Sequence, residues 1–530
     1  MCFKQDSVNW DSHLLNNALS EFWDSAENSA DTELARLSEH SGWAMGCDWT
    51  EEETKIYSEL ANQICMENFQ YVLLIAVGGS SAGARAIVSL GDDSPQFIFV
   101  DSLLPATVEK ILNKVEGKKT LLVVSSKSGT TLETITLANY FLDKLFSSLT
   151  TSNGSKNAIA ITDPGTDLEK FALQHNFRSV VYGKLNIGGR FSELSSFGLF
   201  PALLNRSNVS SVVDAANVMV SLCRNLECQQ NPAILLSDYL GNNLAQGRDK
   251  LYVYLPSSMK NFAMWLEQLL SESLGKEGFG IIPIVGDPKL LSPSKDVCAV
   301  IYEDLSDPDK SVFEIREYLE DYSIPTYEIQ IDGPAGIGSE FFRWKLSVVL
   351  IANLMNINPF DQPQVQKSKD MTNKILDHFA IEGELPPTTP TMSFSEWVKS
   401  ITNNNYVAIL PFVCIEDSER ELLFRLAADI RSLTGAHVTV ASSPSFIHST
   451  GQMHKGGPPS GVFLQLLTTA SKEVPIKDEG YGLSTLVTAQ ADGDMEALLS
   501  LGRPVCRVNL GSDINKGLID LLFDVKNIRM

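Results

Sequence analysis

A glycine-rich turn at residues 78–81 has the residue types of an anion-binding loop. The segment Gly78-Gly79-Ser80-Ser81 directly follows the apolar residues 71–77 and precedes a helical pattern. Glycines at a strand-to-helix turn let the backbone approach a ligand, and the exposed N–H groups and dipole of the helix favour a phosphate. A Gly-Gly turn without a ligand has the same sequence signature, so Gly79 and Ser80 are only candidate ligand-binding residues.

A second candidate anion site lies at residues 125–134. Its sequence, SSKSGTTLET, follows the apolar residues 120–124 and opens a predicted helix. The hydroxyl residues are more numerous than a helix N-cap requires, and hydroxyls donate to phosphate without adding formal charge. Residues three apart share one helix face, so we expect hydroxyls 128, 131 and 134 to point the same way. We predict a phosphate cradle made of Ser126, Lys127, Ser128, Thr131 and Thr134.

Buried-type apolar runs alternate with amphipathic helical segments along most of the chain. This alternation is typical of an α/β protein with doubly wound parallel sheets covered by helices on both faces. The predicted strands fall into three groups: 71–77, 97–101, 120–126 and 158–163; then 251–256, 280–286, 298–304 and 326–332; then 406–412, 437–443, 461–467 and 504–510.

These groups predict the domain organisation. We expect an N-terminal helical segment (1–65), a first α/β domain (66–230), a second (231–383), a Pro- and Thr-rich linker (384–398) and a C-terminal α/β unit (399–530). The third unit repeats the strand–helix–strand layout of the second in the same order, which we interpret as a duplication. Any two α/β units look alike at this level, so independent origins stay open.

The two cradle motifs and three later ones resemble the sugar-isomerase (SIS) domains of phosphoglucose isomerases. The later motifs are Gly188-Gly189-Arg190-Phe191-Ser192, the segment from Gln268 to Lys276, and the segment from Phe360 to Lys369, all in the family order. Residues 448–465, HSTGQMHKGGPPSGVFLQ, are most similar to the isomerase half of bifunctional transaldolase/phosphoglucose isomerase proteins, although no transaldolase part is present. The resemblance implies SIS-type sheets and interconversion of glucose 6-phosphate and fructose 6-phosphate, a reaction of glycolysis and gluconeogenesis.

The resemblance also implies roles for individual residues. Glu272 would be the base that moves a proton between C1 and C2 of the open-chain sugar, with Gln268 one helical turn earlier on the same face. A partly desolvated carboxylate suits this task because its pKa rises toward the working pH. Arg190 would stabilise the negative charge that develops on the enediol(ate) intermediate.

Three further residues carry expected roles in substrate binding and ring opening. By resemblance, Gln362 lies near the phosphate or substrate, and Lys369 assists ring opening, although Lys367 competes on spacing. His448 would protonate the ring oxygen, because a histidine titrates near neutral pH. The family histidine precedes the lysine segment, whereas His448 follows it, and His454 is a competing candidate.

The displaced histidine predicts an unusual assembly. In family members with two units, this histidine reaches the site from the partner subunit. Here the third unit could supply His448 from the same chain, so a dimer is less necessary and the protein is a monomer or a homodimer.

Composition excludes several other classes of function. The formal net charge of -23 repels nucleic acid and anionic membranes. Scattered cysteines without C-x-x-C spacing, no signal-peptide pattern and no run of about 18 apolar residues predict a cytoplasmic protein with no membrane segment. The histidines form no metal-binding spacing, so we expect no metal or cofactor and a small sugar phosphate as the partner. An isomerase of mannose 6-phosphate or an amino-sugar phosphate, and a non-catalytic sugar-phosphate sensor, stay open as alternatives.

Overall fold

The structure is a computed structural model of the whole chain. It describes residues 12–27, 40–92, 94–146, 155–227, 229–286, 291–441, 444–469, 472–477 and 479–529. The beginning of the predicted N-terminal helical segment and the end of the predicted strand 437–443 lie outside these residues. Within the described ranges, no helix is both long and apolar enough to cross a bilayer.

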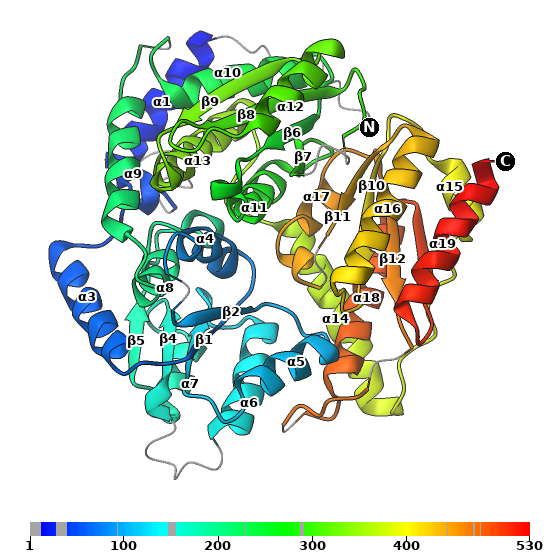
Figure 1. Cartoon of the computed structure of the whole chain (residues 1–530), viewed down its shortest axis with the longest axis horizontal. Helices are drawn as coiled ribbons and strands as arrows, with labels where there is room; N and C mark the ends of the chain where they lie inside the picture. The colour runs from blue at the N-terminus through cyan, green and yellow to red at the C-terminus, as the bar shows by residue number, and fades with distance from the viewer. Residues whose placement is uncertain are drawn as a thin grey trace.

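Three parallel sheets form the scaffold, which confirms the predicted α/β class (Figure 1). The first sheet has the order β2-β1-β3-β4-β5, the second β7-β6-β8-β9 and the third β11-β10-β12-β13. The strands are β1 (Tyr71–Ala76), β2 (Gln96–Val100), β3 (Thr120–Ser125), β4 (Ala158–Thr162), β5 (Ser179–Tyr182), β6 (Lys250–Tyr254), β7 (Ile282–Val285), β8 (Val297–Asp304), β9 (Thr326–Ile331), β10 (Tyr406–Pro411), β11 (His437–Val440), β12 (Gly461–Leu467) and β13 (Val505–Asn509).

Helices cover these sheets. In chain order they are α1 (Ser12–Glu27), α3 (Glu51–Met66), α4 (Gly79–Val88), α5 (Pro105–Val115), α6 (Leu132–Phe146), α7 (Asp167–Gln174), α8 (Ser196–Leu204), α9 (Val209–Cys223), α10 (Pro232–Ala245), α11 (Phe262–Leu274), α12 (Lys310–Asp321), α13 (Ile337–Leu354), α14 (Pro363–Glu382), α15 (Phe394–Ser400), α16 (Asp417–Thr434), α17 (Gly451–Gly456), α18 (Leu483–Ser500) and α19 (Ile514–Arg529).

The N-terminal helices are divided between two units. Helix α1 packs against α10 and α13 beside the second sheet, whereas α3 packs against α8 beside the first. The first residues of the described chain therefore complete the core of the second unit. The exact residues at which one domain ends and the next begins stay a prediction.

The three sheets share a strand order in which the second strand in sequence lies outermost, followed by the first, third and fourth. Because the first sheet has this order too, topology alone does not single out the second unit as the origin of the third. The edge strand β5 was not predicted, since it is short and only Val181 within it is buried.

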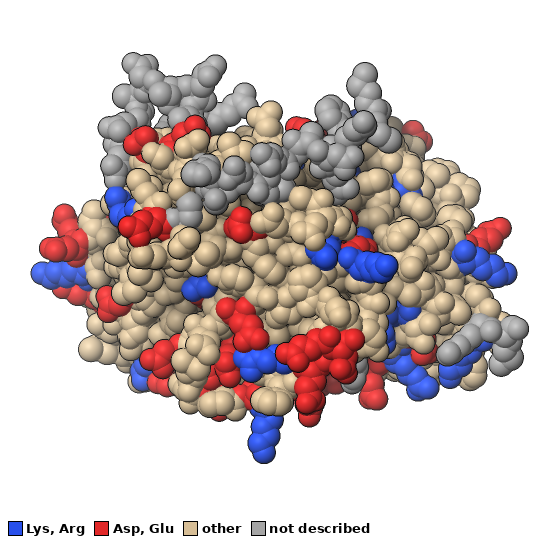
Figure 2. Space-filling view, turned by 90° about the horizontal axis from the view of Figure 1, so that it is seen from above, with Lys and Arg blue, Asp and Glu red and all other residues tan. Residues whose placement is uncertain are grey.

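The units meet at the centre of the molecule. Helices α4 and α11 contact each other, and α17 packs on both α11 and α14 (Figure 1). One apolar core joins the second and third sheets, and another joins the first and third. On the face drawn in Figure 2, acidic side chains gather along one edge, in keeping with the net charge of -23.

Candidate active site

The glycine-rich turn is packed against two other loops of the candidate site. Gly78 has φ +62, and a Cβ atom there would lie 3.1 Å from the His448 carbonyl oxygen. A Cβ atom on Gly79 would lie only 2.4 Å from the carbonyl carbon of Gly189. Both positions therefore require glycine, and the turn brings α4 into contact with the loops that carry Arg190 and His448.

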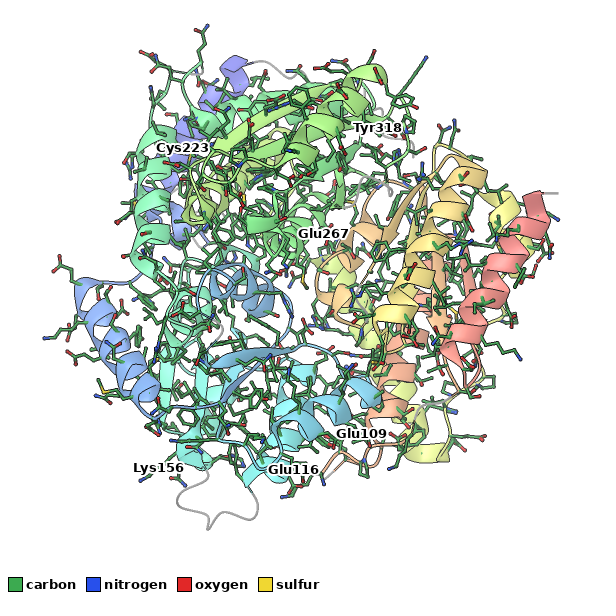
Figure 3. The ribbon with its side chains drawn as sticks, in the orientation of Figure 1. Glu109, Glu116, Lys156, Cys223, Glu267 and Tyr318 are labelled. Atoms are coloured by element: carbon green, nitrogen blue, oxygen red, sulfur yellow. The ribbon has the colours of Figure 1, made fainter. Side chains whose placement is uncertain are left out.

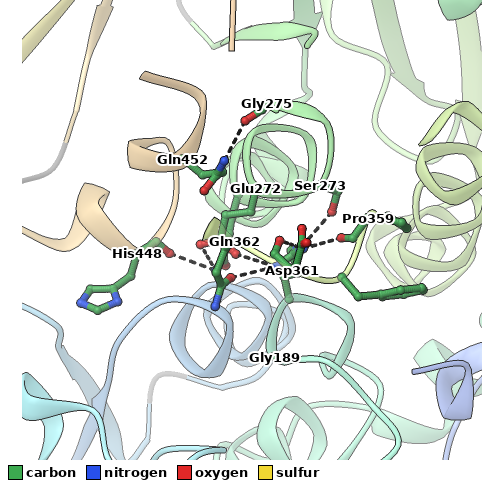
Figure 4. Close-up of polar contacts among 12 residues, drawn as sticks. Gly189, Glu272, Ser273, Gly275, Pro359, Asp361, Gln362, His448 and Gln452 are labelled. Atoms are coloured by element: carbon green, nitrogen blue, oxygen red, sulfur yellow. Dashed lines mark hydrogen bonds and ion pairs between the residues drawn. The ribbon is translucent and has the colours of Figure 1, made fainter. Parts of the chain in front are cut away.

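Glu272 lies buried near the end of α11, with 4% of its surface exposed. Its Oε2 atom accepts a hydrogen bond from Arg190 Nη1 at 3.1 Å, and its Oε1 atom accepts one from Gln268 Nε2 at 3.3 Å (Figure 4). Burial raises the pKa of Glu272, and the charge of Arg190 only partly offsets this effect. The carboxylate is thus desolvated and held from both sides, as a base near neutral pH requires.

Arg190, in the short 3-10 helix η4 (Gly189–Phe191), is bonded through all its N–H groups. Nε donates to Ser273 Oγ at 2.8 Å, and Nη1 donates to Glu272 and to Gln362 Oε1 at 2.9 Å. Nη2 donates to the carbonyl oxygens of Pro359 and Asp361. A guanidinium has five N–H donors, so none is left unused in this arrangement. Arg190 is first of all the ion-pair partner of Glu272.

His448 reaches the site from the third unit of the same chain, in η8 (Ser445–His448). Its carbonyl oxygen accepts from Gln268 Nε2 at 3.0 Å, while its ring points away from Glu272 (Figure 4). Ring atom Nε2 lies 2.8 Å from Glu133 Oε1, which also accepts from Gln490 Nε2 at 2.7 Å. Burial alone would raise the pKa of Glu133, but His448 lowers it to about 2.

The other candidates for ring opening are separated by their surroundings. Lys369, on α14, lines a cavity of about 170 Å³ together with Glu133 and His448. Lys367 instead donates to Ser500 Oγ at 2.9 Å. His454 is buried among aromatic rings, and burial lowers its pKa well below 6.5.

The hydroxyl segment differs from its predicted geometry. Helix α6 begins only at Leu132, so Ser128 and Thr131 lie in the preceding turn and do not share a helix face with Thr134. Gly129, with φ +68, makes this turn. Ser126 Oγ lies 3.0 Å from Thr131 Oγ1, and the Oγ1 atom of buried Thr134 has no hydrogen-bond partner among the described residues.

Lys127 also differs from the expectation. Its ammonium group pairs with Asp163 Oδ2 and donates to the carbonyl oxygen of Lys184 at 2.6 Å. Asp163 thus already compensates the positive charge of Lys127, whereas we expected this charge to bind the phosphate of a ligand. Ser80 is buried in the first turn of α4, and exposed Gln362 precedes α14 at its N-cap position and accepts a hydrogen bond from Arg190.

Sequence reasoning missed several residues that the fold places in this cluster. Glu133 and Lys276 stood inside the quoted motifs, but nothing in their local sequence indicated their partners. Lys276 Nζ pairs with Asp361 Oδ1 at 2.8 Å, and burial lowers its pKa to about 8. Gln452 donates to the Gly275 carbonyl oxygen at 2.9 Å and accepts from the Gln364 N–H at 3.0 Å.

The three parallel sheets give the chain an α/β fold of the sugar-isomerase (SIS) type, and a buried carboxylate and a hydroxyl-lined turn lie between them. Among solved structures, a hypothetical protein from Thermus thermophilus aligns with a TM-score of 0.58 and 21% identity over 68% of this chain and 94% of that one. A glucose-6-phosphate isomerase from Chlamydia trachomatis aligns with a TM-score of 0.53 and 19% identity over 70% of this chain and 79% of that one.

Sequence comparison shows similarity to one family of enzymes. The phosphoglucose isomerase family model matches residues 55–279. The glucose-6-phosphate isomerase of Methanocaldococcus jannaschii is 26% identical over 363 residues, which cover 61% of this chain and 88% of the relative. The chain is thus similar to phosphoglucose isomerases over residues 55–279.

Proposed function

We propose that this chain interconverts glucose 6-phosphate and fructose 6-phosphate by proton transfer through an enediolate. The observation that carries the proposal is the buried carboxylate of Glu272, held by Gln268 and Arg190 inside the segment matched by the family model. A sugar-phosphate sensor needs the cradle but has no use for a desolvated base.

Ring opening is the first step. His448 donates a proton to the ring oxygen as the bond between that oxygen and C1 breaks, and the anomeric hydroxyl releases its proton to solvent, which gives the open-chain aldehyde. Glu133 binds Nε2 and so leaves Nδ1 as the nitrogen that exchanges this proton. Lys369 lies in the same cavity and assists by its charge.

Isomerisation follows at Glu272. The carboxylate takes the proton from C2 of the aldose, and the C1 carbonyl oxygen gains the electron pair. Return of the proton to C1, with transfer of the hydroxyl proton from O2 to O1, gives the ketose. As Glu272 becomes neutral, its hydrogen bond from Arg190 weakens, and the same N–H can turn to the enediolate oxygen. The negative charge therefore stays beside one guanidinium throughout.

The phosphate binds at the turn 126–131, with N–H and hydroxyl groups as donors. Gln362 supports this role, because its Oε1 atom accepts from Arg190 and leaves the NH₂ group for the substrate. The similarity of residues 448–465 to the isomerase half of bifunctional transaldolase proteins is part of the proposal and implies no transaldolase chemistry here.

Turnover of fructose 6-phosphate, coupled to a glucose-6-phosphate-specific readout, tests the proposal. We expect Glu272→Gln to lower kcat by about 10²–10⁴-fold, the range for loss of a general base. Glu314→Gln, on the exposed face of α12, is the matched control and should retain full activity. An active Glu272→Gln variant, or wild-type turnover of mannose 6-phosphate or glucosamine 6-phosphate in preference to fructose 6-phosphate, would contradict the proposal.

A further inference from the structure

A second cavity lies at the junction of all three units, and Gln268 is among the residues that line it. Its volume is about 100 Å³, several times the roughly 10–15 Å³ that one water molecule requires. The first unit contributes Ser81, the second Glu267 and Ser271 on α11, and the third Thr450 and His454. In Figure 3, Glu267 lies where α11 faces the third unit.

The wall of this cavity contains buried polar atoms that lack hydrogen-bond partners. They are Ser81 Oγ, Ser271 Oγ, Thr450 Oγ1, Gln268 Oε1 and His454 Nδ1, all without a partner among the described residues. Four of these residues are at least nine-tenths buried: Ser81 at 3% exposure, Gln268 at 3%, Ser271 at 0% and His454 at 3%. Unpaired buried polar groups are costly, so their convergence on one cavity indicates an occupant that bonds to them.

The charge of the wall selects the kind of occupant. Glu267 forms no ion pair with any described residue, and burial without a counter-charge raises its pKa to about 7. Asp101 also lines the cavity, and its charge is compensated by Arg85 at 2.7 Å. No lysine or arginine lines the cavity among the described residues. A wall whose described residues include an unpaired carboxylate and no cation favours a positively charged occupant.

The remaining wall is apolar. Met264, Ile282, Val440, Phe446 and Met453 lie around the polar atoms. A bare metal ion would leave these surfaces without contact, whereas a short carbon skeleton would cover them.

We propose that this cavity is a second binding site, which takes a small protonated organic amine through the Glu267 carboxylate and the surrounding hydroxyls. The ammonium group supplies the counter-charge of Glu267, and a hydroxyl or second donor on the ligand satisfies Gln268 Oε1. Gln268 lines this cavity and also donates a hydrogen bond to Glu272, so the amine binds next to the candidate active site and leaves it free for the sugar phosphate.

Ethanolamine is the probe, and ethylene glycol is its uncharged counterpart of equal size. Calorimetric titration at pH 8 should show ethanolamine binding to one site at least tenfold more tightly than ethylene glycol. Glu267→Gln should weaken ethanolamine binding at least tenfold, and Glu314→Gln should leave it unchanged. Binding should also weaken as the pH falls below about 7, because protonation removes the Glu267 charge.

Three results would overturn the proposal. The first is ethanolamine affinity that Glu267→Gln leaves intact. The second is a crystal structure soaked in ethanolamine at pH 8 with only water in the cavity. The third is competition between ethanolamine and fructose 6-phosphate, which would place the amine in the sugar site. Turnover by the wild-type chain is a separate measurement, so failure here leaves the proposed isomerase function untouched.

Discussion

The pKa of Glu272 is set by two opposing influences. Burial disfavours its charged form, and Arg190 at 3.1 Å favours it, with burial the stronger. A fully solvated glutamate would be too weak a base, and one dominated by the arginine would be weaker still. Arg190 favours the ionised carboxylate, while burial raises its proton affinity above that of a solvated glutamate.

This balance predicts the acid limb of the pH–rate profile. As the pH falls, Glu272 takes up a proton and loses its function, so kcat/KM should fall with a midpoint above the ordinary value of 4.5. Arg190→Met removes the charge that lowers this pKa, and the midpoint should move to higher pH in the activity that remains. The measurement is kcat/KM against pH, and a midpoint at or below 4.5 for the wild type would contradict it.

A second titrating group predicts the alkaline limb. Lys276 forms an ion pair with Asp361 and donates a hydrogen bond to the Asn358 carbonyl oxygen. The segment 358–362 in turn accepts hydrogen bonds from Arg190. With a pKa of about 8, Lys276 loses its charge as the pH rises, and the segment should loosen. We expect kcat/KM to decline above pH 8, and Lys276→Arg to shift that decline upward. If the alkaline limb is the same in Lys276→Arg as in the wild type, Lys276 is not its cause.

Glu133 predicts a separable effect on ring opening. Glu133→Gln keeps the shape but removes the charge that orients His448, and a hydrogen bond to a charged group contributes about 1.5–3 kcal/mol. We expect turnover of the cyclic substrate to fall about 10- to 100-fold. Isomerisation of an analogue that cannot close its ring should be unchanged. Equal losses for both substrates would mean that Glu133 acts on the proton transfer itself.

At the scale of elements, the sequence predicted those strands and helices that a local residue pattern determines. Strands β1, β3 and β4 are fully or almost fully buried apolar runs, so they carry a strong signal. The predicted start of α6 was several residues too early, because Gly129 extends the turn that precedes the helix. The contact between Glu133 and His448 spans 315 positions and leaves no local trace, so only the fold reveals it.

The glycine turn gives a prediction at this scale. In Gly79→Ala, the new methyl group would lie 2.4 Å from the backbone of Gly189, which cannot move without displacing Arg190. Overpacking of this kind costs about 1–3 kcal/mol, so the melting temperature and kcat should both fall. Gly480→Ala, which meets nothing within 4 Å, is the matched control. Calorimetry and turnover of both variants decide the matter, and an unaffected Gly79→Ala variant would refute the close contact.

At the scale of the whole molecule, residues of all three units meet at the candidate site. Gln268 of the second unit bonds to the His448 carbonyl oxygen of the third at 3.0 Å, and Glu133 of the first bonds to its ring. The unusual position of His448 after Lys369 in the sequence indicated this arrangement. The packing of α17 on α11 and α14, which delivers the histidine, could not be predicted from that order.

A site assembled within one chain predicts the outcome of mixing two inactive variants. A Glu272→Gln chain and a His448→Ala chain each lack one residue of the site. If both residues act in the site of their own chain, exchange of subunits cannot create an intact site. We expect no recovered activity after the two variants are co-expressed and co-purified, whatever their oligomeric state. In a symmetric dimer that shared residues across its interface, half the dimers would be mixed and would hold one intact site each, which restores about a quarter of wild-type activity. Recovery near that level would show that His448 acts on the partner subunit.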